Sequence, residues 1–152
     1  MVRGEVYNEQ ADKTVYLFLP EGNVEIPGKW VRTAFDESKQ QQYFANVDAD
    51  TVSIGKSPAK IYPFYTASKS KFKLVNDFYE WDADHWIKQG MSVNKIEENV
   101  AEKYVIWQVK GPNTDKMFLF GSKDKLVVNY MISADWDKET KADFLKSMYV
   151  RS

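Results

Sequence analysis

The chain has 152 residues, a length typical of one domain with room for a substantial hydrophobic core. Its 21 basic and 22 acidic residues are well mixed and give a net charge of −1, so no basic stripe points to a nucleic-acid partner. The absence of cysteine excludes disulfides, thiolate metal sites, iron–sulfur clusters and cysteine nucleophiles. We therefore expect a single α+β domain over residues 1–152 that needs no cofactor.

Aromatic residues make up 15% of the chain, more than a small core readily absorbs, and some of them are therefore candidates for contact surfaces. No apolar run approaches the roughly 20 residues of a transmembrane helix, so we expect no transmembrane segment. We expect no signal peptide before residues 1–4. We expect either a cytoplasmic protein or a trimmed mature domain, and we favour an extracytoplasmic location.

The first third of the chain predicts an antiparallel meander of four strands, at residues 14–19, 29–35, 41–47 and 51–55. Glycine, proline, asparagine and aspartate mark the turns at residues 20–23, 27–28, 36–39 and 48–50. A looser segment over residues 56–67 follows, and its two prolines and several aromatic residues indicate irregular structure against the core.

Residues 72–87 predict a long helix, capped by Ser68 or Ser70 and ended by Gly90. At about 100° per residue, its apolar side chains fall on two stripes that we place roughly opposite each other. The first stripe contains Phe72, Val75, Tyr79, Ala83 and Trp86, and the second contains Leu74, Phe78, Trp81 and His85. We expect Phe72, Val75, Tyr79 and Trp86 to pack on the sheet. The second stripe then lies under residues 58–67 or faces outward as a contact patch.

Strands resume at residues 92–97 and 104–109, and a hairpin follows at residues 117–120 and 125–132, with its loop at 121–124. Trp107 lies in mid-strand, so we expect it to be buried. The last strand is apolar on both sides, which indicates that helices cover both faces of the sheet. A terminal helix is capped by Asp135 or Asp137 and turns Phe144, Leu145 and Met148 inward. The order of elements predicts an α+β fold with helices packed on an antiparallel sheet.

The chain carries no pattern of a known catalytic or metal site. His85 is the single histidine, and of its acidic neighbours only Asp82, three residues away, can reach it on a helix. No second histidine completes a typical transition-metal site. We expect no catalytic residue, no metal ligand and no cofactor.

Two family resemblances bear on the fold. Gly28-Lys29-Trp30 resembles the Gly-x-Trp signature of lipocalins, in which the tryptophan closes a ligand-holding barrel, but a long central helix departs from that family. The order of elements, with Pro27-Gly28-Lys29-Trp30 after an initial strand, resembles the PsbP-like families. That resemblance implies an antiparallel sheet between helices (an α/β/α sandwich-like, PsbP-like fold). It also implies a noncatalytic binding or assembly factor, often outside the cytoplasm.

Three functional hypotheses follow. The first is a noncatalytic binding or assembly module that uses Leu74, Phe78, Trp81 and His85 to contact a protein partner or a second copy of itself. The second is a carrier of a small apolar ligand, held in an aromatic-lined pocket behind Trp30. The third is a hydrolase that uses His85 and an aspartate.

Overall fold

The computed structural model describes residues 3–18, 22–37 and 40–152. Its small antiparallel sheet has the order β1-β2-β3, with β1 (Arg3–Asn8), β2 (Lys13–Phe18) and β3 (Gly22–Pro27). Its large antiparallel sheet has the order β4-β5-β6-β10-β9-β8-β7. The strands of the large sheet are β4 (Val31–Asp36), β5 (Gln41–Ala45), β6 (Thr51–Pro58), β7 (Ser92–Asn99), β8 (Tyr104–Gly111), β9 (Thr114–Lys123) and β10 (Leu126–Ser133).

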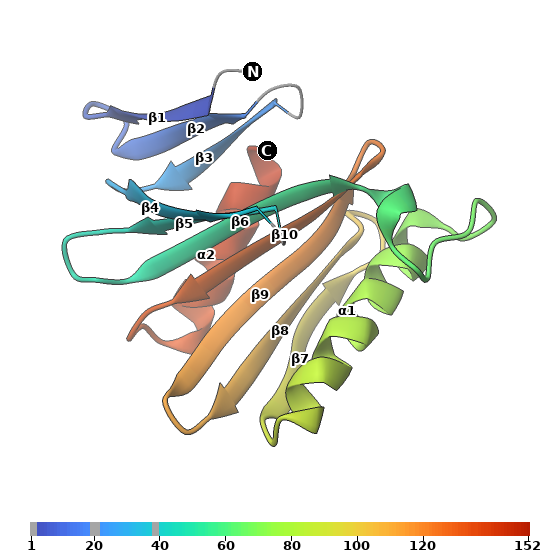
Figure 1. Ribbon diagram of the computed structural model, residues 1–152. Coiled ribbons are helices and arrows are strands. Elements are labelled where there is room, and N and C mark those ends of the chain that lie inside the picture. Colours follow the sequence, from blue (N-terminus) through green and yellow to red (C-terminus); the bar gives the residue numbers. More distant parts are fainter. Residues whose placement is uncertain (1–2, 19–21, 38–39) are drawn as a thin grey trace.

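Two helices, α1 (Lys71–Lys88) and α2 (Lys138–Val150), lie on opposite faces of the large sheet (Figure 1). A short 3-10 helix, η1 (Ala59–Ile61), follows β6. Helix α1 contacts β7, β8 and β9, whereas α2 contacts β9, β10 and strand β3 of the small sheet. This is the α+β arrangement that the order of elements predicted.

Strand β8 shows why two covering layers are needed. All six residues from Tyr104 to Val109 are buried, and successive side chains of a strand point to opposite faces. Val105, Trp107 and Val109 face α1, and Tyr104 and Ile106 face α2. Strand β10 alternates in the same way, with Val127 toward α1 and Val128 toward α2, which confirms that the last strand is apolar on both sides.

The layer on the α2 side also contains the small sheet. Tyr16, Val24 and Ile26 are fully buried in the cluster that α2 completes. Near the end of α2, the Tyr149 hydroxyl lies 2.9 Å from the carbonyl oxygen of Ser122, and burial raises the pKa of Tyr149 to about 12. Its ring lies over Gly121, where an added Cβ would overlap it, so this close approach requires glycine.

Both helices begin at capping residues that the sequence pointed to. The Ser70 Oγ accepts a hydrogen bond from the Lys73 N–H at 3.1 Å, and the Asp137 carboxylate accepts one from the Thr140 N–H at 2.7 Å. The sequence left two capping residues open for each helix. Ser70, not Ser68, caps α1, and Asp137, not Asp135, caps α2. Gly90, at φ +86°, follows the end of α1 in the left-handed region that favours glycine.

The N-terminal strands were predicted only in part. Residues 13–18 form a strand as expected, but it pairs with β1 and β3 in a separate sheet and does not join the meander of β4, β5 and β6. Strand β1 was not predicted, and β3 begins where a turn was predicted. Gly121 and Ser122, placed in a loop, belong to β9, and the turn forms at Asp124, whose φ is +55°. Residues 19–21 and 38–39 of the predicted elements lie outside the described residues.

Glu97 joins three elements at the edge of the large sheet. Its carboxylate accepts a hydrogen bond from the Tyr104 hydroxyl at 2.7 Å and forms an ion pair with Lys146 of α2 at 3.2 Å. The hydrogen bond from Tyr104, with the charge of Lys146, holds the pKa of Glu97 below its ordinary value although burial opposes this. The ionised form is therefore the one that stabilises the fold.

We predict that replacing Trp107 with alanine lowers the free energy of unfolding by about 3–5 kcal/mol, because the ring is fully buried. Trp107 packs on Phe118 with 4.5 Å between ring centroids. Its indole Nε1 is buried, with no hydrogen-bond partner among the described residues. Trp107→Phe removes that donor and keeps an aromatic ring, so it should cost less than half as much. Urea unfolding of both variants measures this, and an unchanged midpoint for Trp107→Ala would contradict the packing.

We predict that Glu97→Gln lowers stability by about 0.5–1 kcal/mol at neutral pH, because Glu97 is partly exposed and its ion pair is screened. A lowered folded-state pKa stabilises the fold above the ordinary pKa of glutamate, and this contribution disappears as the pH falls through the folded-state value. The difference in the free energy of unfolding between the wild type and Glu97→Gln should therefore become smaller toward acidic pH. Urea midpoints measured at pH 7 and at about pH 3 test this, and a difference that grows on acidification would overturn it.

Candidate functional site

An aromatic stack runs from the large sheet through α1 to the segment before it. Phe78 lies against Phe120 of β9, with 4.2 Å between ring centroids and 12° between the ring planes. On its other side Phe78 meets Tyr62, at 4.8 Å, and Phe64, at 5.9 Å. Phe78 therefore lies between the sheet and residues 59–70, and it is 5% exposed.

This packing divides the predicted contact patch. Leu74 and Phe78 are each 5% exposed and belong to the core beneath α1. Trp81 is 41% exposed, and His85 is exposed as well. The surface part of the patch is thus Trp81 and His85, and its role as a contact stays a prediction.

The two apolar stripes of α1 lie next to each other on the buried side of the helix. Tyr79 packs on Trp107 and Trp86 packs on Phe118, so these members of the first stripe lie on the sheet as predicted. Placing the second stripe roughly opposite was wrong for Phe78. At about 100° per residue, Phe78 and Val75 are only about 60° apart around the helix. The sheet therefore covers one flank while residues 59–70 cover the other.

Trp81 ends the stack at the surface. Its ring centroid lies 5.9 Å from that of Phe64 and 6.2 Å from that of Phe78, and it forms an edge-to-face pair with the His85 ring at 4.9 Å. The Nδ1 of His85 lies 2.7 Å from the Trp81 carbonyl oxygen. Because a carbonyl only accepts, the Nδ1 of His85 carries a proton and donates this hydrogen bond. Trp81 and His85 therefore hold each other in fixed positions, and we call them the Trp81–His85 surface.

An ion pair fastens the segment before α1 to the helix. Lys69 lies 2.7 Å from the carboxylate of Asp77, which also pairs with Lys73 one turn away. Burial raises the pKa of Asp77, but the hydrogen bonds and charges of Lys69 and Lys73 outweigh it and hold this pKa below the ordinary value. Phe64, which touches Trp81, is thus held close to α1 by the same segment.

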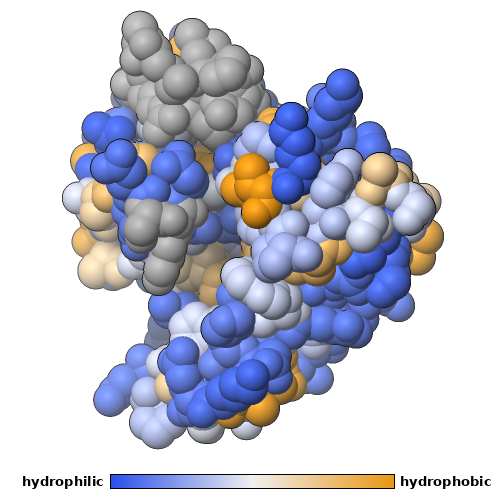
Figure 2. All heavy atoms as spheres, turned by 45° about the vertical axis from the view of Figure 1, so that its right-hand side comes forward, coloured by the Kyte–Doolittle hydropathy of each residue, from blue (hydrophilic) through white to orange (hydrophobic). Residues whose placement is uncertain are grey.

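Figure 2 shows the molecule from the side of α1, where hydrophilic colour dominates and hydrophobic colour appears in separate small areas. Apart from Trp81, the large apolar side chains that are exposed nearby in sequence are Ile61 and Tyr65 in the preceding segment and Ile87 in the helix. A contact on this face would therefore depend on a few side chains and not on a broad apolar patch.

The position of Trp30 does not support the carrier hypothesis. No group of three or more histidine, cysteine, aspartate or glutamate side chains that could hold a metal occurs in the described part of the chain. Trp30 is 3% exposed, donates its indole N–H to the Pro27 carbonyl at 2.7 Å, and packs 5.8 Å from Phe144. Trp30 is thus a core residue at a turn, and it does not line the polar pocket on the α2 side of the sheet. Over the described residues, the structure has no helix long and apolar enough to cross a membrane.

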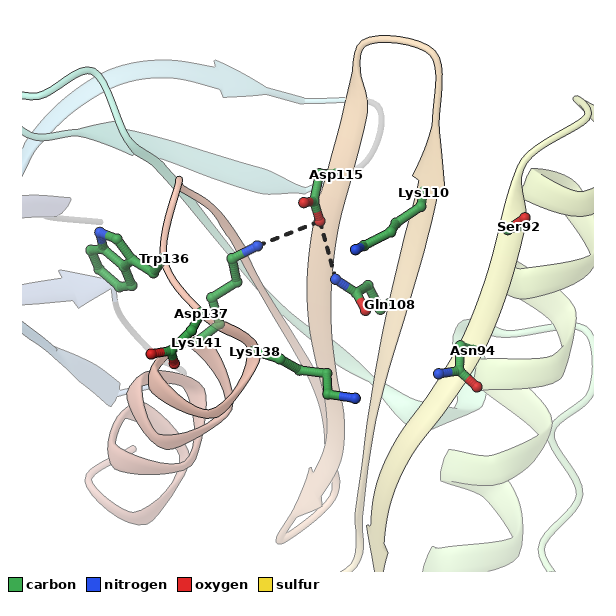
Figure 3. Close-up of a pocket in the computed structure, with 9 residues that line it drawn as sticks. All are labelled: Ser92, Asn94, Gln108, Lys110, Asp115, Trp136, Asp137, Lys138 and Lys141. Carbon is green, nitrogen blue, oxygen red and sulfur yellow. Dashed lines mark hydrogen bonds and ion pairs between the residues drawn. The ribbon is translucent and has the colours of Figure 1, made fainter.

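A polar pocket of about 520 Å³ lies on the opposite face, between the start of α2 and strands β7, β8 and β9 (Figure 3). Sequence reasoning missed it, although two signals point to it. Along the α2 face of β8, buried Tyr104 and Ile106 give way to Gln108 and Lys110. Lys141 occupies the inward stripe of α2, three and four residues before buried Phe144 and Leu145. The polar side chains that line the pocket include Asn94, Gln108, Lys110, Asp115, Lys138 and Lys141.

Comparison with known proteins identifies the fold. No protein-family model and no curated protein sequence matches the chain. Among solved structures, it is similar to the solution structure of cyanobacterial PsbP (CyanoP) from Synechocystis sp. PCC 6803. The TM-score is 0.57 at 10% sequence identity, over 98% of this chain and 90% of that chain. The chain therefore has a PsbP-like fold, as the order of its elements indicated.

We predict that His85→Ala changes the free energy of unfolding by no more than about 0.5 kcal/mol, because His85 is exposed and its ring hydrogen bond lies within one helical turn. Thermal melting of the variant beside the wild type measures this. A broad hydrolase screen supplies the second readout. Turnover by the wild type that is lost in His85→Ala would restore the hydrolase hypothesis.

Proposed function

We propose that the protein is a noncatalytic binding or assembly domain, and that the Trp81–His85 surface is where it contacts a protein partner. The observation that supports this most is the position of Trp81. Its large aromatic side chain is 41% exposed at the end of a packed aromatic stack. Tryptophan is among the residues that contribute most to protein interfaces when it is exposed in the free protein and buried in the complex.

The stack favours binding because it restricts the side chain beforehand. Trp81 is held by Phe64, Phe78 and His85, so little conformational freedom is left to lose when a partner covers it. The ion pairs of Asp77 with Lys69 and Lys73 keep the supporting segment in place. The PsbP-like fold supports the same proposal through the family resemblance, which implied binding and assembly factors.

The proposal is tested by placing a photoreactive aromatic amino acid at position 81 in the native host, and at position 87 as a control. Ile87 is also on α1 and is 55% exposed, but it lies about 120° away around the helix. We expect one discrete cross-linked product from position 81 that is absent from position 87. A product of twice the chain's mass would identify a second copy as the partner.

We predict that Trp81→Lys weakens binding to the purified, cross-linked partner by about tenfold or more, because a lysine loses the aromatic contact. Ile87→Lys should bind as the wild type does, and the melting temperatures of both variants should stay close to the wild type. The proposal fails if Trp81→Lys binds as tightly as the wild type. It also fails if Ile87→Lys weakens binding equally, or if positions 81 and 87 give the same cross-links.

A further inference from the structure

The pocket beside α2 is separate from the Trp81–His85 surface because the large sheet lies between them. Gln108 and Lys110 extend from the face of β8 that carries Tyr104 and Ile106, the face covered by α2. Trp107 and Val109, which alternate with them, pack beneath α1. A ligand in this pocket would therefore not compete with a partner bound on α1.

Two of the polar side chains that line this pocket are buried. Gln108 is 7% exposed and Lys141 is 2% exposed, although both occupy positions in line with apolar core residues. Burying an ammonium group costs free energy unless it is well paired. An apolar residue would complete the packing of α2 at position 141, so the fold alone does not account for a lysine.

The pairing of Lys141 inside the protein is weak. Its ammonium group lies 3.4 Å from the Asp115 carboxylate, longer than a typical charge-assisted hydrogen bond. Asp115 also accepts a hydrogen bond from the Gln108 amide at 3.2 Å, and its side chain is 49% exposed. The carboxylate of Asp115 is thus shared between two donors and solvent.

Positive charge exceeds negative charge around the centre of the pocket. Figure 3 shows the side chains of Lys110, from β8, and Lys138, from α2, extending toward the middle of the pocket from opposite sides. No ion pair of either lysine is found among the residues that the structure describes. Two carboxylates, those of Asp115 and Asp137, also line the pocket, and Asp137 is engaged in the hydrogen bond that caps α2. The three lysines therefore outnumber the acidic side chains.

We propose that this pocket binds the carboxylate or phosphate group of a small organic anion. Lys110, Lys138 and Lys141 supply the charge, and the amides of Gln108 and Asn94 supply further hydrogen-bond donors. A volume of about 520 Å³ is large enough for a small molecule. Trp136, which packs on Phe144 and also lines the pocket, offers an apolar surface for the uncharged part of the ligand.

The probes are inorganic phosphate, phenyl phosphate and benzoate, titrated into ¹⁵N-labelled protein and followed by NMR. We expect saturable shifts of the side-chain amides of Gln108 and Asn94 that weaken with added salt. Phosphate and benzoate distinguish the two anion classes, and a tighter affinity for phenyl phosphate than for phosphate would place the aromatic group at Trp136. Shifts that rise linearly with every probe and spread over surface lysines would overturn the proposal.

The double variant Lys110→Gln/Lys138→Gln should weaken binding by about tenfold or more, because two charges are lost at the site. Lys88→Gln is the matched control, since its side chain is 75% exposed on α1, across the sheet, and it should bind as the wild type does. Equal binding by the double variant and the wild type would refute the site.

In Lys141→Met, anion binding should be lost while the urea midpoint is equal to or above that of the wild type. A clearly lower midpoint would show that Lys141 serves the fold and not a ligand.

Discussion

Burial on both faces is the constraint on which the rest of this structure depends. Strands β8 and β10 carry apolar side chains in consecutive positions, so neither face of the large sheet can be left to water. Helix α1 covers one face, and α2 together with the small sheet covers the other. The small sheet, which no local pattern ties to the large one, is held in place because Tyr16, Val24 and Ile26 complete the second layer.

Both candidate sites arise where these covering layers end. On one face, the aromatic stack that holds α1 on β9 continues through Phe78 to Trp81, where the last ring reaches solvent. On the other face, apolar packing beneath α2 stops near its first turn, and Gln108, Lys110 and Lys141 take the places that core residues hold elsewhere. The sheet separates the two candidate sites, so occupation of one would leave the other accessible.

The sequence predicted those features that a local pattern determines. Alternation in β8 and β10 identified the buried Trp107 and the two-sided last strand, and short polar residues marked both helix caps. Features that depend on tertiary packing were missed. Strand β3 contains Gly22, Asn23 and Pro27, which are typical of turns, and it becomes a strand because Val24 and Ile26 are buried against α2. The inner position of Phe78 depends on residues 59–70 folding back over α1, and the pocket depends on where α2 is placed, which no periodicity in the chain encodes.

Native-state amide hydrogen exchange tests the two-sided burial most directly. If both faces are required, the amides of β8, β9 and β10 should exchange only by global unfolding, with a free energy equal to that from urea denaturation. The outer strands β4 and β7 should open at lower free energy, because each has one unpaired edge in the described sheet. Exchange of the Leu119 and Tyr130 amides at a free energy well below that of global unfolding, or below that of β4, would contradict the account.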